Sequence, residues 1–280
     1  MRRRHGCSRG ASPTRLSAVL AVALAACASP ELDEPALPST QVTADSRADL
    51  DARHRAEFQR ADLFKPAMDA ADLDPYQAPL VYVECDSGDA GELEPTRDDA
   101  LSARAASPAV YFREEPASPD GVRPRAITFA WFVPTDDGAR LQGLRTTFGA
   151  GGRPALVEIS ADRTGAAVLY AARSLERAAA ERLGEPLPDE FALTARLAPH
   201  QVLVGTFEDG PMAMGPYLYH GAGSTDVWNL HCRCEPTRAH EIRELVEYRL
   251  RPLAELESDE ALSFAPFEQL VEALRPATDS

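Results

Sequence analysis

Residues 126–149 read AITFAWFVPTDDGARLQGLRTTFG, and the fold expected for the middle of the chain follows from them. Two runs rich in β-branched and aromatic residues, 126–134 and 141–149, flank the hexapeptide TDDGAR. An Asp-Gly pair between two such runs is typical of the tight turn of a β-hairpin. The stretch therefore predicts two antiparallel strands joined by a short turn.

Similar segments on both sides extend this hairpin into a sheet. Short apolar or alternating runs bounded by turn residues predict further strands at 80–85, 108–114, 155–160 and 201–207. The segment 208–236 adds two apolar strands around a glycine-rich turn. Together these segments predict a meander of antiparallel strands.

Helical spacing of apolar residues predicts helices around this sheet. A helix is expected at 174–184, with Ser174 as its N-cap and Gly184 at its end. The stretches expected to form the other helices are 46–66, 236–257 and 266–276. The fold class predicted is α+β, an antiparallel meander with C-terminal helices packed on it.

The N-terminus resembles the signal sequence of bacterial lipoproteins. Five arginines and no acidic residue stand in the first fifteen positions, and an apolar run follows at 16–26. That run is shorter than the roughly 20 apolar residues of a membrane span, but it suits a secretory signal. Leu24-Ala25-Ala26-Cys27 then resembles a lipobox. The resemblance implies cleavage before Cys27 and attachment of diacylglycerol and palmitate chains to it. The alternative is an ordinary secretory signal with an Ala-x-Ala cleavage site.

The domain organisation follows from this signal. Residues 1–26 are the expected signal peptide, and Ala28 rather than aspartate follows the cysteine, which the resemblance associates with the outer membrane. Residues 27–76 are expected to hold the lipidated cysteine, a disordered tether rich in proline, serine, threonine and acid, and a short helix. Residues 77–280 are expected to form the globular domain.

The charge of the chain excludes some classes of partner. Cleavage before Cys27 removes five arginines and no acidic residue, which takes the formal net charge from −15 to −20. Nucleic-acid binding needs a basic face, and electrostatic docking on anionic lipid needs basic clusters. We therefore expect no nucleic-acid partner, and we expect membrane contact through the lipid anchor.

The stretch LHCRC at 230–234 raises the question of what its two cysteines do. In a strand, Trp228, Leu230, Cys232 and Cys234 share one face, which is the arrangement of buried core residues. The bacterial envelope is oxidising, so thiols there tend to pair. The leading hypothesis is a disulfide from Cys85 to Cys232 or to Cys234.

A soft-metal or thiol-redox site is the alternative for these cysteines. Thiolate and thioether sulfur suit Cu(I) or zinc. The residues that would supply this sulfur are Cys85, Met212, Met214, Cys232 and Cys234. The chain lacks the Cys-x-x-Cys pairs of common zinc sites.

The segment EDGPMAMGPYLY, followed by LHCRC, is similar to a pattern in uncharacterised secreted proteins of environmental bacteria. The residues that carry this likeness are Asp209, Gly210, Pro211, Met214, Gly215, Pro216, Cys232, Arg233 and Cys234. The resemblance implies no particular activity. We expect a lipid-anchored envelope protein that is a non-enzymatic structural or binding module, without cofactor or catalytic residues. The class of its protein or small-molecule partner stays open.

Overall fold

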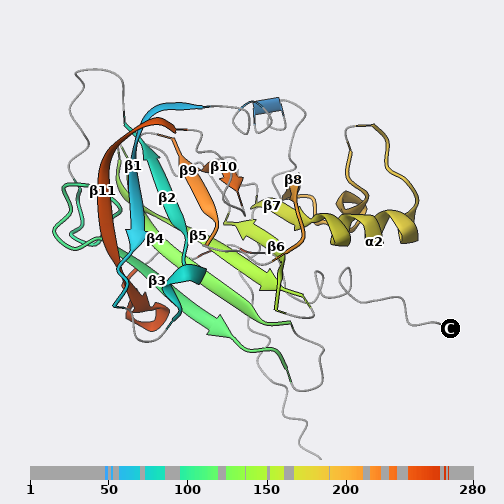
Figure 1. The fold of residues 1–280 in the computed structure, drawn as a ribbon, viewed down its shortest axis with the longest axis horizontal. Coiled ribbons are helices and arrows are strands. Elements are labelled where there is room, and N and C mark those ends of the chain that lie inside the picture. The colour runs from blue at the N-terminus through green and yellow to red at the C-terminus, as the bar shows by residue number, and fades with distance from the viewer. Residues whose placement is uncertain are drawn as a thin grey trace, which may run out of the picture. The chain divides into compact units, whose positions relative to one another are not determined.

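A single mixed sheet of eleven strands forms the centre of a computed structural model of the chain, and the sheet curls around its own interior (Figure 1). The structure describes residues 48–49, 52, 57–69, 73–85, 95–118, 124–135, 137–149, 152–160, 167–188, 190–210, 215–221, 227–231 (backbone only), 239–258, 262 and 264. All of them belong to one unit, Leu37–Ser280.

The strands follow each other along most of the chain. They are β1 (Phe58–Pro66), β2 (Leu80–Glu84), β3 (Ala109–Glu115), β4 (Ala126–Thr135), β5 (Gly138–Phe148), β6 (Pro154–Ile159), β7 (Ala167–Ala172), β8 (Gln201–Phe207), β9 (Tyr217–His220), β10 (Val227–His231) and β11 (Ala239–Pro252). The helical elements with described bounds are α2 (Arg173–Leu183) and the 3-10 turns η1 (Pro75–Gln77), η2 (Ala192–Arg196) and η3 (Leu253–Glu255).

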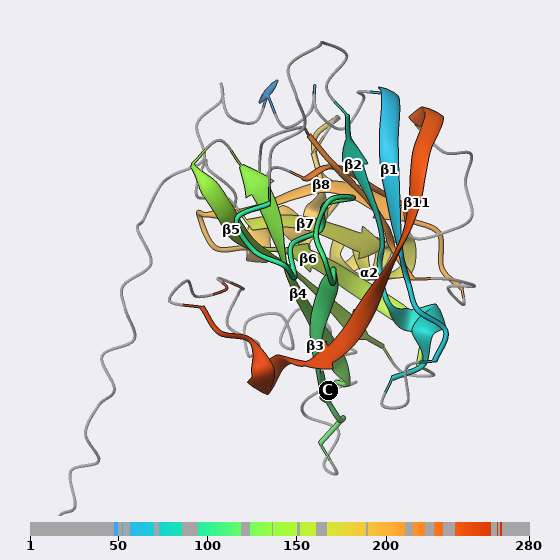
Figure 2. The ribbon, with the colours of Figure 1, turned by 90° about the vertical axis from the view of Figure 1, so that its left-hand side faces the viewer.

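The order of the strands combines a local meander with long-range pairing. Across the sheet the order is β10-β9-β2-β1-β11-β3-β4-β5-β6-β7-β8. Neighbours from β3 to β7 pair antiparallel. Four pairs are parallel, namely β1 with β11, β11 with β3, β2 with β9, and β7 with β8. β11 therefore connects the N-terminal strands to the meander (Figure 2).

The hairpin predicted at 126–149 is confirmed. β4 and β5 pair antiparallel from Ala126 opposite Thr147 to Thr135 opposite Gly138. Gly138 has a φ of 117°, a region that L-residues with a side chain rarely adopt. The Thr135 hydroxyl donates to the carbonyl of Gly138 at 2.6 Å, which closes the turn.

The predicted α+β class is wrong, because the C-terminal segment expected to form a helix is the strand β11. Val246, Tyr248 and Leu250 alternate toward the main core, while Leu245 is 59% exposed. The apolar residues thus follow a period of two, and the apparent helical stripe was coincidental. Pairing with β1 and β3, both distant in sequence, holds this segment extended. The helix predicted at 266–276 lies outside the described residues.

The helix predicted at 46–66 is wrong over its second half. Ala48, Asp49 and Ala52 are helical, but β1 begins at Phe58. This strand lies between β2 and β11 and buries its apolar side chains on both faces. The sheet thus includes a segment that was expected to precede the globular domain.

The helix predicted at 174–184 is confirmed as α2, and Gly184, with a φ of 95°, ends it. Ser174 lies inside the helix instead of at its N-cap position. The Asp209 carboxylate accepts bonds from the backbone N–H of Ser174, at 3.0 Å, and from its hydroxyl. The helix joins two parallel strands, β7 and β8, and such a connection needs a crossover of this kind. β7 is a strand that the sequence analysis did not predict.

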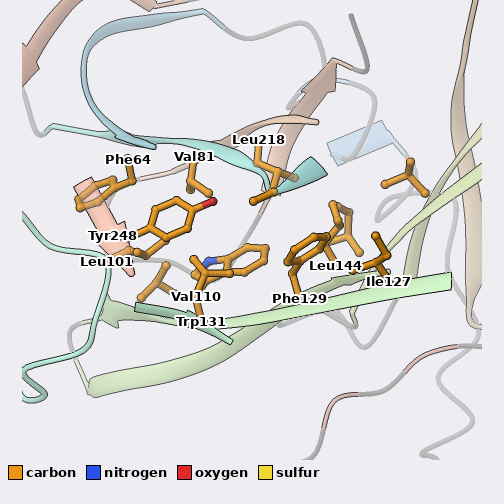
Figure 3. Packing of buried hydrophobic residues seen from close by; sticks show 14 of the residues in the cluster. Phe64, Val81, Leu101, Val110, Ile127, Phe129, Trp131, Leu144, Leu218 and Tyr248 are labelled. Atoms are coloured by element: carbon orange, nitrogen blue, oxygen red, sulfur yellow. The ribbon is translucent and has the colours of Figure 1, made fainter. Parts of the chain in front are cut away.

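The main core fills the inside of the curled sheet. Figure 3 shows Phe64, Val81 and Leu218, from β1, β2 and β9, facing Trp131 and Phe129 of β4 across the interior. All five side chains are fully buried. Strands β1, β2 and β9 therefore face β4 across one shared core.

The outer face of the sheet is covered in part. α2 and η2 pack on β6, β7 and β8 through a second apolar cluster. Leu262 packs against Gly143 of β5. A Cβ atom added to Gly143 would lie 2.6 Å from Cδ2 of Leu262. The ring of Phe264 lies 5.0 Å from the guanidinium of Arg145.

Candidate functional site

A cleft lies beside the end of β11, where the loop at 95–108 meets β3. Its volume is about 320 Å³. We call it the arginine cleft, and its lining consists of Arg97, Asp98, Asp99, Ser107 and Arg251. The loop supplies the first four residues and β11 supplies the last.

The loop is held to the sheet by its own backbone. The N–H of Leu101 donates to the carbonyl of Phe132 at 2.8 Å, and the N–H of Ala109 donates to the carbonyl of Asp99 at 3.1 Å. Leu101 is fully buried in the main core. Backbone bonds and core packing therefore place the loop next to β11.

Arg97 is fixed by three kinds of contact. Its Nε and Nη2 donate to the two carboxylate oxygens of Asp99 at 2.9 and 3.1 Å. Its guanidinium lies 3.8 Å from the ring centroid of Phe132, and its Nη1 donates to the carbonyl of Glu257 at 3.3 Å. A two-oxygen pair of this kind is both strong and directional.

Asp99 and Tyr111 extend this network toward Arg251. The Tyr111 hydroxyl donates to Asp99 at 2.6 Å and accepts from Nη1 of Arg251 at 3.2 Å. Burial tends to raise the pKa of Asp99, but the hydrogen bonds from Arg97 and Tyr111 outweigh it, and the pKa lies below its usual value. Burial, followed by the bond to Asp99, raises the pKa of Tyr111 to about 12.

Arg251 is the more accessible of the two arginines. Its Nε donates to Oε2 of Glu255 at 3.0 Å, and its Nη2 lies 2.9 Å from the same oxygen. The side chains of this pair are 43% and 48% exposed. Exposed ion pairs contribute about 0–1 kcal/mol, so Glu255 holds Arg251 weakly.

Asp98 supplies a second accessible charge. Its side chain is exposed, and within the part of the chain that the structure describes its carboxylate has no ion pair or hydrogen bond. The N–H of Ser107 donates to the backbone carbonyl of Asp98 at 2.8 Å, which keeps the two residues adjacent. The cleft therefore presents a guanidinium and a carboxylate to solvent.

Cys85 is the one predicted site residue that lies among the described residues. It follows β2 as a half-buried free thiol, with Sγ 3.9 Å from the carbonyl of Val83. Burial, followed by the charge of Asp62, raises the pKa of this thiol to about 11. Cys85 is therefore protonated at neutral pH, which disfavours nucleophilic or redox chemistry.

The other predicted site residues lie outside the described part of the chain. They are Cys27, Met212, Met214, Cys232 and Cys234. The strands predicted on either side of the glycine-rich turn are confirmed as β9 and β10, which pair antiparallel. The disulfide and the soft-metal site both remain predictions. Within the described ranges, no three histidine, cysteine or acidic side chains gather as metal ligands would.

The arginine cleft was not predicted from the sequence. Neither Arg97 nor Asp98 was given a role, and Arg251 was expected in a helix at 236–257. The pattern Arg97-x-Asp99 is a local clue to an ion pair, but charged neighbours are common in a chain with 44 acidic residues. Only the pairing of β11 with β3 brings Arg251 to the loop.

Membrane-spanning helices and similarity to known proteins both bear on the class of protein. In the portion of the chain with described structure, none of the helices has the length and apolar character needed to cross a membrane. Comparisons with models of protein families, with curated proteins and with solved structures found no match for this chain. Its function must therefore be inferred from its own residues.

Proposed function

We propose that this chain is a lipid-anchored protein of the bacterial envelope whose curled-sheet domain binds a small charged ligand in the arginine cleft. The anchor would be Cys27, at the end of a sequence that resembles a lipobox. Several acyl chains on one cysteine provide stable membrane attachment, whereas a single chain binds only marginally. The outer membrane is the proposed site, because Ala28 rather than aspartate follows the cysteine.

The observation that carries the binding role is the juxtaposition of accessible opposite charges in one cleft. Arg251 and Asp98 both line an open cleft of about 320 Å³, which has room for a small molecule. The fixed pair of Arg97 and Asp99 forms the wall beneath them. A small ligand can contact such charges without a rearrangement of the sheet.

The protonation states at the cleft favour binding over catalysis. General acid–base chemistry works best when the pKa of the catalytic group lies near the working pH. The pKa of Asp99 is lowered, and that of Tyr111 is raised to about 12. Both groups therefore keep one protonation state near neutrality, as constant binding partners do.

The side-chain network has a further property that supports a ligand site. Backbone bonds already fasten the loop, through Leu101 and Ala109. The exposed pair of Arg251 and Glu255 is therefore not needed to hold the loop in place. Its charges remain free to exchange partners.

Lipid attachment is tested by expressing the full-length protein in a Gram-negative bacterium. We expect the protein in the outer-membrane fraction, with a mass increased by the acyl chains. Cys27→Ala should abolish both results. Cys7→Ala, which changes a cysteine in the basic N-terminal region, is the matched control and should leave both unchanged. Equal lipidation of the Cys27→Ala protein would refute the anchor.

Binding in the cleft is tested by a thermal-shift screen of small charged molecules against the full-length protein in detergent. We expect at least one class of compound to raise the melting temperature by several degrees, since a ligand that binds only the folded state stabilises it. The shift should be lost in Arg251→Gln. A screen without any stabilising compound would argue against the binding role.

A further inference from the structure

We propose that the arginine cleft recognises a small zwitterion, with the carboxylate of the ligand on Arg251 and its ammonium on Asp98. This inference rests on the proposed binding function and names the chemistry of the ligand. It depends on which of the charges at the cleft are already satisfied and which are not.

The carboxylate half of the site is occupied by Glu255 of the chain itself. Both Nε and Nη2 of Arg251 contact the single oxygen Oε2 of Glu255. A guanidinium fork binds best to two oxygens in parallel, so this contact uses only part of its capacity. A ligand carboxylate can supply both oxygens, and Glu255, which is half exposed, can turn into solvent. Glu255 thus occupies the position that the carboxylate of the ligand would take, and we call this its stand-in role.

Tyr111 prepares Arg251 for this exchange. Its hydroxyl accepts from Nη1 at 3.2 Å, and the guanidinium lies 5.3 Å from the ring centroid of Tyr111. These contacts do not involve Glu255, so they persist when that residue leaves. The edge of the guanidinium formed by Nε and Nη2 therefore stays directed toward the incoming carboxylate.

The ammonium half of the site is Asp98. Asp99 cannot serve, because two donors from Arg97 and one from Tyr111 already occupy its oxygens. Among the described residues the carboxylate of Asp98 has no such donors. Ser107, held beside Asp98 by a backbone bond, adds a hydroxyl that can accept from the same ammonium.

The balance of charge explains why a simple anion or cation is disfavoured. Arg97 and Asp99 neutralise each other, and once Glu255 has turned into solvent one positive and one negative group are left for the ligand. An anion without an ammonium would meet the uncompensated charge of Asp98, and a cation without a carboxylate would meet Arg251. Such unmatched charges are a common means of rejecting wrong ligands.

The inference is tested by isothermal titration calorimetry with three matched probes on the full-length protein in detergent. The probes are norvaline, valerate, which lacks its ammonium, and butylamine, which lacks its carboxylate. We expect norvaline to bind at least about 10-fold more tightly than either of the others, since each half-ligand leaves one charge of the cleft unmatched. Inorganic phosphate, titrated as a fourth probe, should bind more weakly than norvaline.

Three variants assign the contacts. Arg251→Lys, which keeps the charge but removes the fork, and Asp98→Asn should each weaken norvaline binding about 10-fold or more. Glu255→Gln should tighten it several-fold, because the internal competitor is lost. Glu257→Gln makes the same chemical change two residues away, where only the backbone carbonyl hydrogen-bonds Arg97 and the side chain acts on it through charge alone, and should change norvaline binding much less.

The outcomes separate this inference from the proposed function. If valerate or phosphate binds as tightly as norvaline, the cleft is a ligand site but the zwitterion is wrong. If Glu255→Gln weakens binding in a protein with an unchanged melting temperature, the stand-in role of Glu255 is overturned. If none of the four probes releases heat and the thermal-shift screen is also negative, both proposals fail.

Discussion

Glu158 on β6 is fully buried, and its carboxylate contacts the guanidinium of Arg145 on the neighbouring strand β5 at 2.6 Å. Arg145 is only 8% exposed, and the ring of Phe264 lies against it. A buried pair of this kind contributes little net stability compared with an apolar pair, but each member depends on the other.

Glu158→Gln should therefore destabilise the fold by about 3–5 kcal/mol, because the buried Arg145 would lose its contact with a charged carboxylate. Urea unfolding followed by circular dichroism would measure this. The matched control is the double change Arg145→Leu with Glu158→Leu, which removes both charges and should cost much less. If Glu158→Gln lowers the free energy of unfolding by less than about 1 kcal/mol, Arg145 does not depend on Glu158, since ordinary surface substitutions cause changes of that size.

Tyr111 makes the stability of the cleft region sensitive to high pH. Its pKa is raised from about 10 to about 12 in the folded protein, by burial first and then by the bond to Asp99. The folded state therefore favours the protonated phenol, and the resulting gain in the free energy of unfolding is fully present below pH 10. It is lost as the pH rises from about 10 to about 12. Tyr111→Phe should show a smaller decline of the free energy of unfolding over this range. An identical decline in both proteins would assign the effect elsewhere, for example to Tyr248, whose pKa burial raises well above its ordinary value.

At the scale of the elements, the parallel pairing of β2 and β9 depends on a close approach of their backbones. Gly215 lies just before β9, and a Cβ atom there would come 1.8 Å from the carbonyl oxygen of Ala78. The N–H of Leu80 donates to the carbonyl of Pro216 at 2.9 Å in the same region. No side-chain rotation can relieve an overlap with backbone, so the strands would have to separate.

Gly215→Ala should thus destabilise the protein by about 3 kcal/mol or more, at the upper end of overpacking effects. Thermal melting followed by circular dichroism would detect the loss. Gly149→Ala is the control, because its added Cβ would make only an ordinary contact of 3.5 Å with Ala155. Equal melting temperatures for the two variants would show that the close approach of β2 and β9 does not limit the stability of the protein.

At the scale of the whole molecule, β11 joins two groups of strands that are far apart in sequence. It lies between β1 and β3 and is parallel to both. Its side chains also complete the main core, where the Tyr248 hydroxyl donates to the carbonyl of Pro79 at 2.5 Å. The sheet cannot close its interior without this strand.

A chain that ends after Arg238 should therefore lose cooperative unfolding, because the N-terminal strands and the meander would each expose one side of the core. A chain that ends after Phe264 keeps every element with described bounds and should melt cooperatively. Differential scanning calorimetry distinguishes the two results. A sharp transition in the shorter chain would show that the meander folds without β11.

Part of the fold and little of the candidate site could be predicted from the sequence. The hairpin of β4 and β5 and the helix α2 depend on turn residues, caps and periodicity that lie within about 25 residues of each other. β11 could not be recognised, because Ile242, Leu245 and Val246 fit a helical stripe as well as a strand. The cleft could not be found, because Arg251 and Asp98 are more than 150 residues apart.

Local elements such as the β4–β5 hairpin and α2 follow from short stretches of the chain, since turn glycines such as Gly138 and Gly184 and the alternation of apolar residues act over a few positions. The strand conformation of β1 and β11 comes instead from tertiary contacts, because a segment with mixed preferences adopts the conformation that its long-range partners stabilise. The same pairing placed Arg251 beside Asp98. The arginine cleft thus arises from contacts between distant segments, which no short stretch of the chain encodes.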